Sequence, residues 1–342
     1  MSRTCLAVAA LMSAAVLRPA VGPEPCEAPP VLNPSKAERC AQDRLLERRG
    51  GKVPGPAQQP TFRSSVDAVT VDVSVRAGSR VITGLTAADF EILDNNVAQE
   101  IADLSYEKLP IDVTVGLDVS QSVNGVLLDQ LRTSVRQLMA DLTKQDRLKL
   151  VTFNHRIARV IDFTADLPAV SAAVKPVTAS GGTSLLDAIA VALISASDTT
   201  RRQLVVMFSD GSDGHSISDE SMVVDVARRS RATLDLVRSI REQQLTGDDS
   251  PISAQQTERA GTPEQQFYAT LTGETGGLVV PVVAPGGDVT STFRRLLSQF
   301  RSCYVLRFTP RGVDRGGYHT LAVRTKRPER LDVRARRGYF GG

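Results

Sequence analysis

From about residue 108 onward, two kinds of apolar pattern alternate along the chain. Short runs rich in β-branched residues, such as Ile111 to Leu117 and Arg202 to Phe208, have the continuous apolar character of strands buried on both faces. Segments between them, such as Ser184 to Ser197, carry apolar residues three and four positions apart, which indicates amphipathic helices. This alternation predicts an α/β fold, doubly wound, with a mainly parallel sheet and helices on both faces.

The same two patterns assign the remaining elements of this region. The predicted strands are 111–117, 147–153, 158–163, 202–208, 233–237 and 278–283. The predicted helices are 126–139, 167–174, 184–197, 222–230, 264–272 and 289–300.

The segments on either side of this region have the character of strands without intervening helices. Valine nearly alternates with polar residues from Val66 to Val75, which is typical of a half-buried strand. Phe90 to Leu93 is predicted to be another strand, and Asp94-Asn-Asn96 a hairpin turn. Three closing strands are predicted at 303–308, 318–324 and 331–333. We expect the two flanking groups to form one small β module.

The N-terminus has the pattern of an export signal. Arg3 precedes a short apolar run, Cys5 to Leu17, which is well below the roughly 20 residues that a bilayer crossing needs. We therefore expect an exported protein of the periplasm, cell envelope or exterior, whose mature chain has no membrane span. The predicted organisation is a signal peptide (1–22), a Pro-rich linker (23–60), an N-terminal β module (61–107), the α/β domain (108–301, with a polar insertion at 238–263) and the C-terminal strands (302–342).

Composition narrows the classes of partner. The 342 residues include no Trp, and aromatic residues make up 4%, which disfavours stacking platforms for nucleic acid or carbohydrate. A net charge of +3 is small for this length and indicates no polyanionic partner. Cys26 and Cys40 could form a disulfide in an oxidising compartment, and Cys303 is predicted to be buried in a strand. No pair of cysteines has the spacing of a zinc site.

Oxygen-bearing side chains follow the predicted strands where these strands end. Asp118, Ser120 and Ser122 come directly after the first strand, Thr183 lies in a Gly-rich loop before a helix, and Asp210 follows another buried strand. Loops at the carboxyl ends of neighbouring parallel strands meet in one crevice, so these five residues are expected to converge. Two carboxylates and three hydroxyls suit a hard divalent cation, Mg²⁺ first and Mn²⁺ or Ca²⁺ as possible substitutes.

These motifs resemble a known site. Asp118-Val-Ser-Gln-Ser122, Gly182-Thr183 and Ser209-Asp210-Gly211 are similar, in order and setting, to the metal-ion-dependent adhesion site of von Willebrand factor type A domains. Together with Val69 to Val73, Gly84 to Phe90, Cys303 to Leu306 and Arg337 to Phe340, they resemble the bacterial exported "VWFA-related" family, in which a β module brackets the A domain.

The resemblance implies protein binding without catalysis. In the family pattern Ser120, Ser122 and usually Thr183 would ligate the metal directly, while Asp118 and Asp210 would act directly or through water. The partner would then be a protein that presents an Asp or Glu side chain to the ion.

Two other functions compete with this expectation. A metal-dependent phosphohydrolase could use Asp118 as a nucleophile, with Lys149 and His155 available in neighbouring segments. Alternatively, the ion could only stabilise the loops of a structural protein. Two further acidic residues are expected to be structural, Asp187 as an exposed or capping carboxylate and Asp213 as a turn residue.

Overall fold

The computed structural model describes residues 68–78, 80–106, 109–196, 201–240, 262–283 and 287–341. All of them belong to one compact unit, Ser65–Gly342. The predicted signal peptide, the linker, Cys5, Cys26 and Cys40 lie outside the described residues. Most of the predicted insertion also lies outside them, although its first residues do not, because the preceding strand continues to Ile240.

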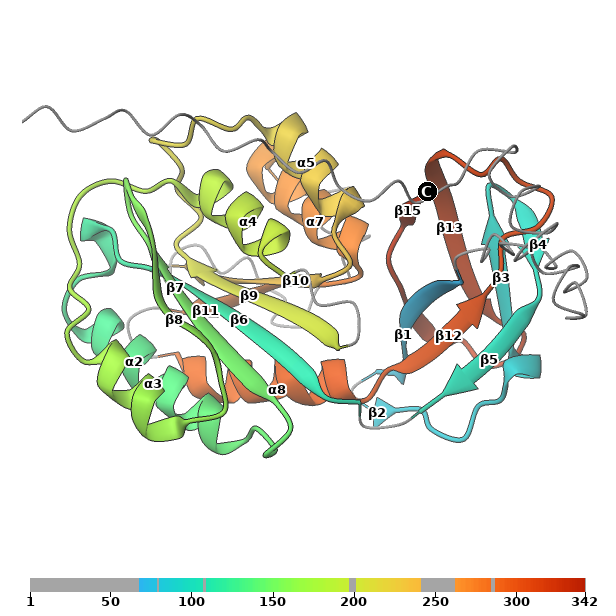
Figure 1. The fold of residues 1–342 in the computed structure, drawn as a ribbon, viewed down its shortest axis with the longest axis horizontal. Coiled ribbons are helices and arrows are strands. Elements are labelled where there is room, and N and C mark those ends of the chain that lie inside the picture. The colour runs from blue at the N-terminus through green and yellow to red at the C-terminus, as the bar shows by residue number, and fades with distance from the viewer. Residues whose placement is uncertain are drawn as a thin grey trace, which may run out of the picture. The chain divides into compact units, whose positions relative to one another are not determined.

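The α/β domain is built on a six-stranded sheet (Figure 1). Its strands stand in the order β11-β10-β9-β6-β7-β8, and every neighbouring pair is parallel except β7 and β8. β6 and β9 are buried at every position, as their continuous apolar sequences predict. The strands are β6 (Ile111–Asp118), β7 (Arg147–Phe153), β8 (Ile157–Thr164), β9 (Arg202–Ser209), β10 (Thr233–Ile240) and β11 (Val279–Val283).

Helices cover both faces of this sheet (Figure 1). On one face α2 (Val126–Ala140), α3 (Leu167–Val174) and α8 (Val289–Arg301) enclose one hydrophobic core. On the other face α4 (Leu185–Ile194), α5 (Glu220–Arg229) and α7 (Pro263–Thr275) enclose a second. The prediction of an α/β domain is therefore confirmed.

The flanking segments form two antiparallel sheets around a third hydrophobic core. One sheet has the order β14-β1-β12-β5, with β2 beside β1, and the other has the order β15-β13-β3-β4. The C-terminal segment contributes one strand more than the sequence predicts, β15, which pairs with β13. The strands are β1 (Val69–Ala77), β2 (Arg80–Val81), β3 (Phe90–Asp94), β4 (Val97–Gln99), β5 (Ile101–Ser105), β12 (Tyr304–Phe308), β13 (Gly317–Thr325), β14 (Asp332–Arg334) and β15 (Gly338–Gly341), with a 3₁₀ turn at Ala87–Asp89.

Residues of α5 and α7 make part of the contacts between the α/β domain and the β sheets. The carboxylate of Glu274 accepts a hydrogen bond from the Tyr318 hydroxyl (2.5 Å) and pairs with Arg228 (3.2 Å). The Arg336 guanidinium donates to the main-chain oxygens of Arg228 and Ser230. Glu274 is buried, so its hydrogen bonds are shielded from water and hold Tyr318 of β13 in one position against α7.

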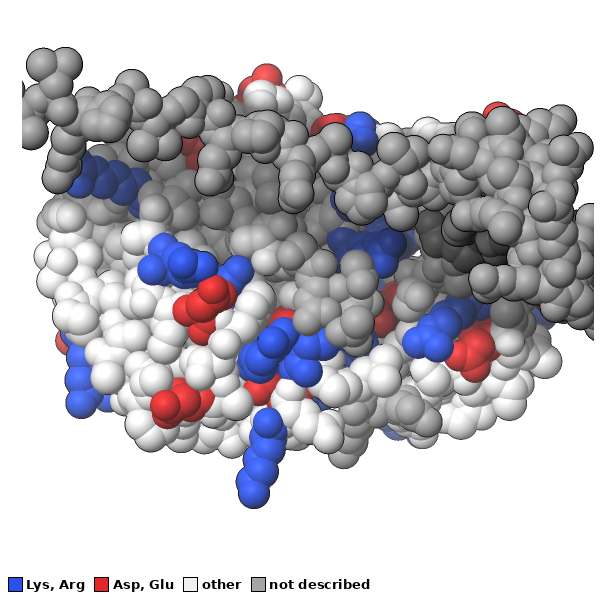
Figure 2. All heavy atoms as spheres, viewed as in Figure 1, with Lys and Arg blue, Asp and Glu red and all other residues white. Residues whose placement is uncertain are grey.

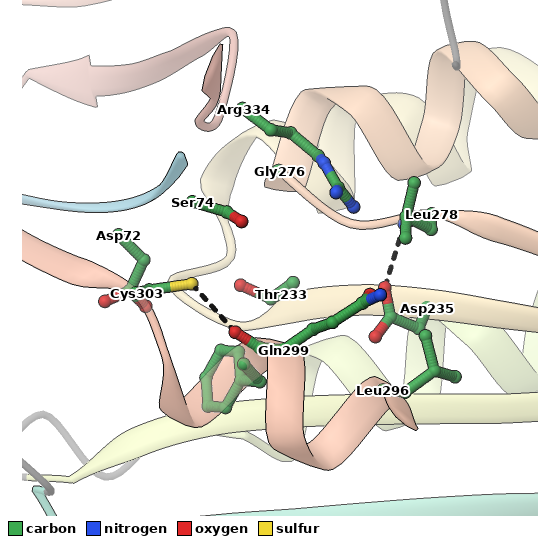
Figure 3. A pocket seen from close by; sticks show the side chains of 11 residues that line it. Asp72, Ser74, Thr233, Asp235, Gly276, Leu278, Leu296, Gln299, Cys303 and Arg334 are labelled. Atoms are coloured by element: carbon green, nitrogen blue, oxygen red, sulfur yellow. Dashed lines mark hydrogen bonds between the residues drawn. The ribbon is translucent and has the colours of Figure 1, made fainter. Parts of the chain in front are cut away.

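A small cavity lies near the amino end of β10, next to β1 and β14 (Figure 3). Its volume of about 30 Å³ suits water-sized molecules. Asp235 of β10, Gln299 of α8 and Arg334 of β14 line it (Figure 3). Burial raises the pKa of Asp235 to about 6, although Arg334 and the Leu278 N–H act to lower this pKa. Cys303 also lines this cavity and is a free, buried cysteine, as predicted.

Two further properties of the described residues concern membrane spans and surface charge. In the part of the chain that the structure describes, no helix has the length and apolar character needed to cross a membrane. On the face shown in Figure 2, basic and acidic side chains lie beside one another instead of gathering by sign. Within the basic segment 324–337, residues 332–334 form β14.

Candidate functional site at the carboxyl edge of the sheet

The first loop of the site follows β6, where a buried strand ends on a carboxylate. Asp118 is fully buried, and its Oδ1 accepts the Ser120 backbone N–H at 2.8 Å. The next residues form a short 3₁₀ turn, Gln121–Val123, before α2 begins. This turn brings the hydroxyl oxygens of Ser120 and Ser122 to 3.1 Å from each other. Ser120 is buried and Ser122 is exposed, so the pair reaches from the end of the strand to the surface.

The second loop, which carries Thr183, is hydrogen-bonded to the first. The Gln121 N–H donates to the carbonyl of Gly181 (2.9 Å), and the Ser180 N–H donates to the carbonyl of Val119 (2.8 Å). Gly181 has a φ of +74°, a conformation that side chains other than glycine rarely adopt. The sequence Gly181-Gly182 is therefore needed to bring Thr183, which is buried, beside the first loop.

The third loop, which carries Asp210, is joined to the second. The carbonyl of Thr183 accepts the backbone N–H groups of Gly214 (3.1 Å) and His215 (3.0 Å). Asp210 is half-buried, and its Oδ1 accepts the Ser212 N–H at 2.9 Å. The structure thus brings the three predicted loops together at one edge of the sheet.

The carboxylates of this edge influence each other. Burial raises the pKa of Asp118, and the neighbouring negative charge of Asp210 raises it further. Hydrogen bonds from Ser120 and Ser209 act in the opposite direction without cancelling the effect of burial. A cation between the two carboxylates would reverse this electrostatic cost, because each anion would then face an opposite charge.

The donor set fits a small divalent cation. Mg²⁺ binds oxygen at about 2.0–2.1 Å in octahedral geometry, so two adjacent ligands of one ion lie about 3 Å apart. The hydroxyl oxygens of Ser120 and Ser122, 3.1 Å apart, already have that separation. Hydroxyl and carboxylate oxygens are ligands for Mg²⁺, Mn²⁺ or Ca²⁺ and poor ligands for softer metals.

Ser209 supports the site, a role that the sequence analysis did not assign although it named Ser209 within the third motif. Its hydroxyl donates to Asp118 Oδ2 at 2.7 Å. The parallel register pairs Leu117 with Phe208, so the next residues along each strand, Asp118 and Ser209, are also neighbours. Knowledge of this register would have identified Ser209 from the sequence, whereas the apolar pattern alone did not.

Asp187 and Asp213, which were expected to be structural, hold the second and third loops in place. Asp213 Oδ1 accepts the Leu185 N–H at 2.8 Å and the Ser216 hydroxyl at 2.7 Å. It thereby caps α4, whose own N-cap residue, Ser184, makes no side-chain cap. The carboxylate of Asp187 accepts the N–H groups of both Ile217 (2.9 Å) and Ser218 (2.8 Å).

We predict that Asp213→Ala lowers the free energy of unfolding by about 1 kcal/mol, the usual loss for a helix cap. Because Asp213 caps the helix that begins two residues after Thr183, the variant should also bind Mg²⁺ several-fold more weakly. Urea denaturation and isothermal titration calorimetry measure the two effects.

The matched control for this prediction is Asp288→Ala. Asp288 is the N-cap of α8 and accepts the Ser291 N–H at 2.9 Å, and α8 follows β11, whose end carries no proposed ligand. We expect a similar loss of stability with unchanged affinity for Mg²⁺. Equal weakening of Mg²⁺ binding in both variants would show that Asp213 has no particular link to the site.

The loop of Asp210 is also held from β10 and α7. The buried hydroxyl of Tyr268 donates to the carbonyl of Gly211 at 2.8 Å. Arg238 lies close to Gly211 and pairs with Glu264 at 2.8 Å. Gly211 has a φ of +89° and lacks room for a side chain beside Arg238. These contacts fix the backbone from which Asp210 projects.

The structure gives little support to a phosphohydrolase. Lys149 is 5% exposed, and its ammonium group donates to the carbonyl of Ser195 and lies over the ring of Phe163. It stands four residues before Phe153, the partner of Asp118, and so about 13 Å toward the other end of the sheet. His155 is exposed and lies against Gly181 at the edge of the site. The cation that a phosphate would need is therefore not supplied by Lys149.

The chain is similar to known proteins over part of its length. The family model described as "von Willebrand factor type A domain" matches residues 113–212, which include all five predicted ligands. An uncharacterized protein from Synechocystis sp. is 25% identical over 125 residues, which is 35% of this chain and 30% of that protein. The match thus spans less than a third of the length of that relative.

Solved structures are similar over parts of the chain. A von Willebrand factor type A protein from Catenulispora acidiphila is 12% identical, with a TM-score of 0.46, over 82% of this chain and 75% of its own. The corresponding domain of the pilus tip protein Mfa5 from Porphyromonas gingivalis is 26% identical, with a TM-score of 0.29, over 31% of this chain and 40% of its own. The minor pilin PilB from Streptococcus sanguinis is 13% identical, with a TM-score of 0.42, over 57% of this chain and 62% of its own.

Proposed function

Because residues 113–212 form a von Willebrand factor type A domain, we propose that this protein binds other proteins through a divalent cation at the carboxyl edge of its sheet. Asp118, Ser120, Ser122, Thr183 and Asp210 are the proposed ligands. Mg²⁺ is the ion that the donor set suits best, with Mn²⁺ or Ca²⁺ as substitutes. The role is recognition, with no chemical transformation of the partner.

The observation that carries this proposal is the pair of hydroxyl oxygens 3.1 Å apart next to a buried carboxylate. The two serine hydroxyls are within hydrogen-bonding distance of each other, and Asp118 is buried beside them at the end of a strand, where burial raises its pKa. An arrangement that is unfavourable for the protein alone becomes favourable when a cation binds there.

The number of side-chain oxygens also fits partner binding. Five side chains at most, some of them acting through water, leave at least one of about six positions open on the ion. A bound divalent cation would supply positive charge at that position. The residues of this chain orient the ion, and the exposed hydroxyl of Ser122 places it at the surface. The complementary group on a partner is an Asp or Glu carboxylate.

The proposed location is outside the cytoplasm, in the periplasm, the cell envelope or the extracellular space. The Arg3-led apolar segment at the N-terminus supports this placement. In such compartments Mg²⁺ and Ca²⁺ are available to a site that is open at the surface.

The proposal is tested by affinity capture from envelope extract with the wild-type chain and with Asp118→Ala, in Mg²⁺ and in EDTA. We expect one or more proteins to be retained by the wild-type chain in Mg²⁺ only, and to be released by EDTA. Capture that survives both EDTA and Asp118→Ala would contradict a metal bridge. If chelation lowers the melting temperature while capture is unchanged, the ion only stabilises the loops.

A further inference from the structure

An exposed apolar side chain projects from the third loop of the proposed metal site. Ile217 is 94% exposed, the largest value for a large hydrophobic residue in the part of the chain that the structure describes. Its backbone is nevertheless fixed, because the N–H groups of Ile217 and Ser218 both donate to the carboxylate of Asp187. Burial of Asp187 opposes its ionisation, but hydrogen bonds from the Ser218 hydroxyl and from the N–H groups of Ile217 and Ser218 outweigh burial and lower its pKa.

The fixed position of Ile217 connects it to the metal site. Asp187 lies in the first turn of α4, the helix that begins two residues after Thr183. His215, two residues before Ile217, donates its N–H to the carbonyl of Thr183. Ile217 therefore lies at the same edge of the sheet as the proposed ligands, held by the loops that carry Thr183 and Asp210.

Two further exposed apolar residues continue this surface along α4. Asp187, Val191 and Ile194 are spaced by four and three residues and so lie on one side of the helix. Val191 is 43% exposed and Ile194 is 66% exposed. Side chains on a helix lean toward its N-terminus, so Val191 leans toward Asp187 and the Ile217 backbone bound to it. We call Ile217, Val191 and Ile194 the α4 apolar row.

Isolated exposed hydrophobic residues are common and need no explanation. This row differs in two respects. It begins on the loop that carries Asp210, and its most exposed member stands on a backbone that is held by two hydrogen bonds. An apolar side chain on a fixed backbone loses little conformational freedom when it is buried by a partner, which is the property of an interface anchor.

We propose that the α4 apolar row is a second contact site for the partner, which presents an apolar side chain close in sequence to its metal-bound carboxylate. This inference rests on the proposed function. The metal would fix the acidic residue, and the row would select among acidic sequences by their neighbouring apolar residue. Charge attraction at a metal accepts any accessible carboxylate, so an apolar contact beside it is needed for selectivity.

The test uses a displayed library of short random peptides that each contain one fixed Asp, selected on the immobilised chain in Mg²⁺. We expect the wild-type chain to enrich an apolar residue at a constant offset from the Asp. Ile217→Ser should abolish this enrichment and lower the affinity of a selected peptide about tenfold, the effect of exposing one aliphatic side chain. Its stability should be unchanged, since Ile217 makes almost no buried contact.

Leu167→Ser is the matched control, because Leu167 is a partly exposed residue of α3, on the opposite face of the sheet. It should select the same peptides as the wild-type chain.

The inference would be overturned, and the metal proposal left intact, by Mg²⁺-dependent selection without an apolar preference. The same holds if Ile217→Ser shows the same apolar preference as the wild-type chain. Absence of any Mg²⁺-dependent selection would overturn both. Mg²⁺-independent self-association that Ile217→Ser removes would assign the row to a second copy of the chain and overturn the inference.

Discussion

Replacement of Asp118 by alanine is expected to lower the affinity for Mg²⁺ at least a hundredfold and to leave the α/β domain folded. Asp118 is the buried carboxylate of the proposed site, and its removal deletes both a negative charge and the acceptor for Ser120 and Ser209. Without metal, its negative charge is disfavoured by burial and by Asp210, so the loss of this charge should offset part of the lost hydrogen bonding.

Calorimetric titration with Mg²⁺ measures the affinity directly, and thermal unfolding gives an independent measurement. A ligand at about a hundred times its dissociation constant stabilises the native state by about 2.7 kcal/mol, so Mg²⁺ should raise the melting temperature of the wild-type chain clearly. In Asp118→Ala this rise should disappear, whereas the melting temperatures in EDTA should be similar.

The control for Asp118 is Asp314→Asn, which removes an exposed acidic charge of the β sheets. Its Mg²⁺ affinity and its Mg²⁺-dependent melting should match those of the wild-type chain. If Asp118→Ala still bound Mg²⁺ with wild-type affinity, the ion would be held elsewhere and the proposed ligand set would be wrong.

Much of the α/β domain could be predicted from the sequence because its signals are local. Strands buried on both faces are continuous apolar runs, and the predicted segments 147–153 and 167–174 coincide with β7 and α3. By contrast, β5 was missed because its residues are partly exposed and show no regular alternation. It is a strand because it pairs with β12, some 200 residues later, and such a partner leaves no local signal.

The same distinction applies to the candidate site. The three ligand loops were predicted to converge because parallel strands direct their carboxyl ends to one edge, and the hydrogen bonds of Gly181 and Thr183 join the loops. The supporting role of Ser209 depends on strand register, and that of Asp213 depends on how one loop folds against another helix. Sequence patterns therefore indicated which atoms could bind an ion, and the structure was needed to identify the residues that position them.

The buried carboxyl of Asp235 should make stability depend on pH in a defined direction. Its pKa in the folded chain is raised to about 6 from the ordinary 3.8, chiefly by burial. A raised pKa means that the folded state favours the protonated form, so the associated stability is fully present below about pH 4 and is lost as pH rises through about 6. The difference corresponds to about 3 kcal/mol at neutral pH and above.

Asp235→Asn should therefore unfold like the wild-type chain at pH 4 and be more stable by about 2–3 kcal/mol at pH 8. Asparagine retains a side-chain oxygen that can accept the Leu278 N–H, while it removes the buried charge. Denaturant unfolding at the two pH values measures the difference in the free energy of unfolding, and Asp314→Asn should show no such difference.

Equal destabilisation of Asp235→Asn at both pH values would mean that packing around the side chain, and not its ionisation, determines the effect. Destabilisation at pH 8 alone would mean that the attraction between Asp235 and Arg334 across the cavity exceeds the penalty of burial, and that this ion pair holds β14 to the α/β domain.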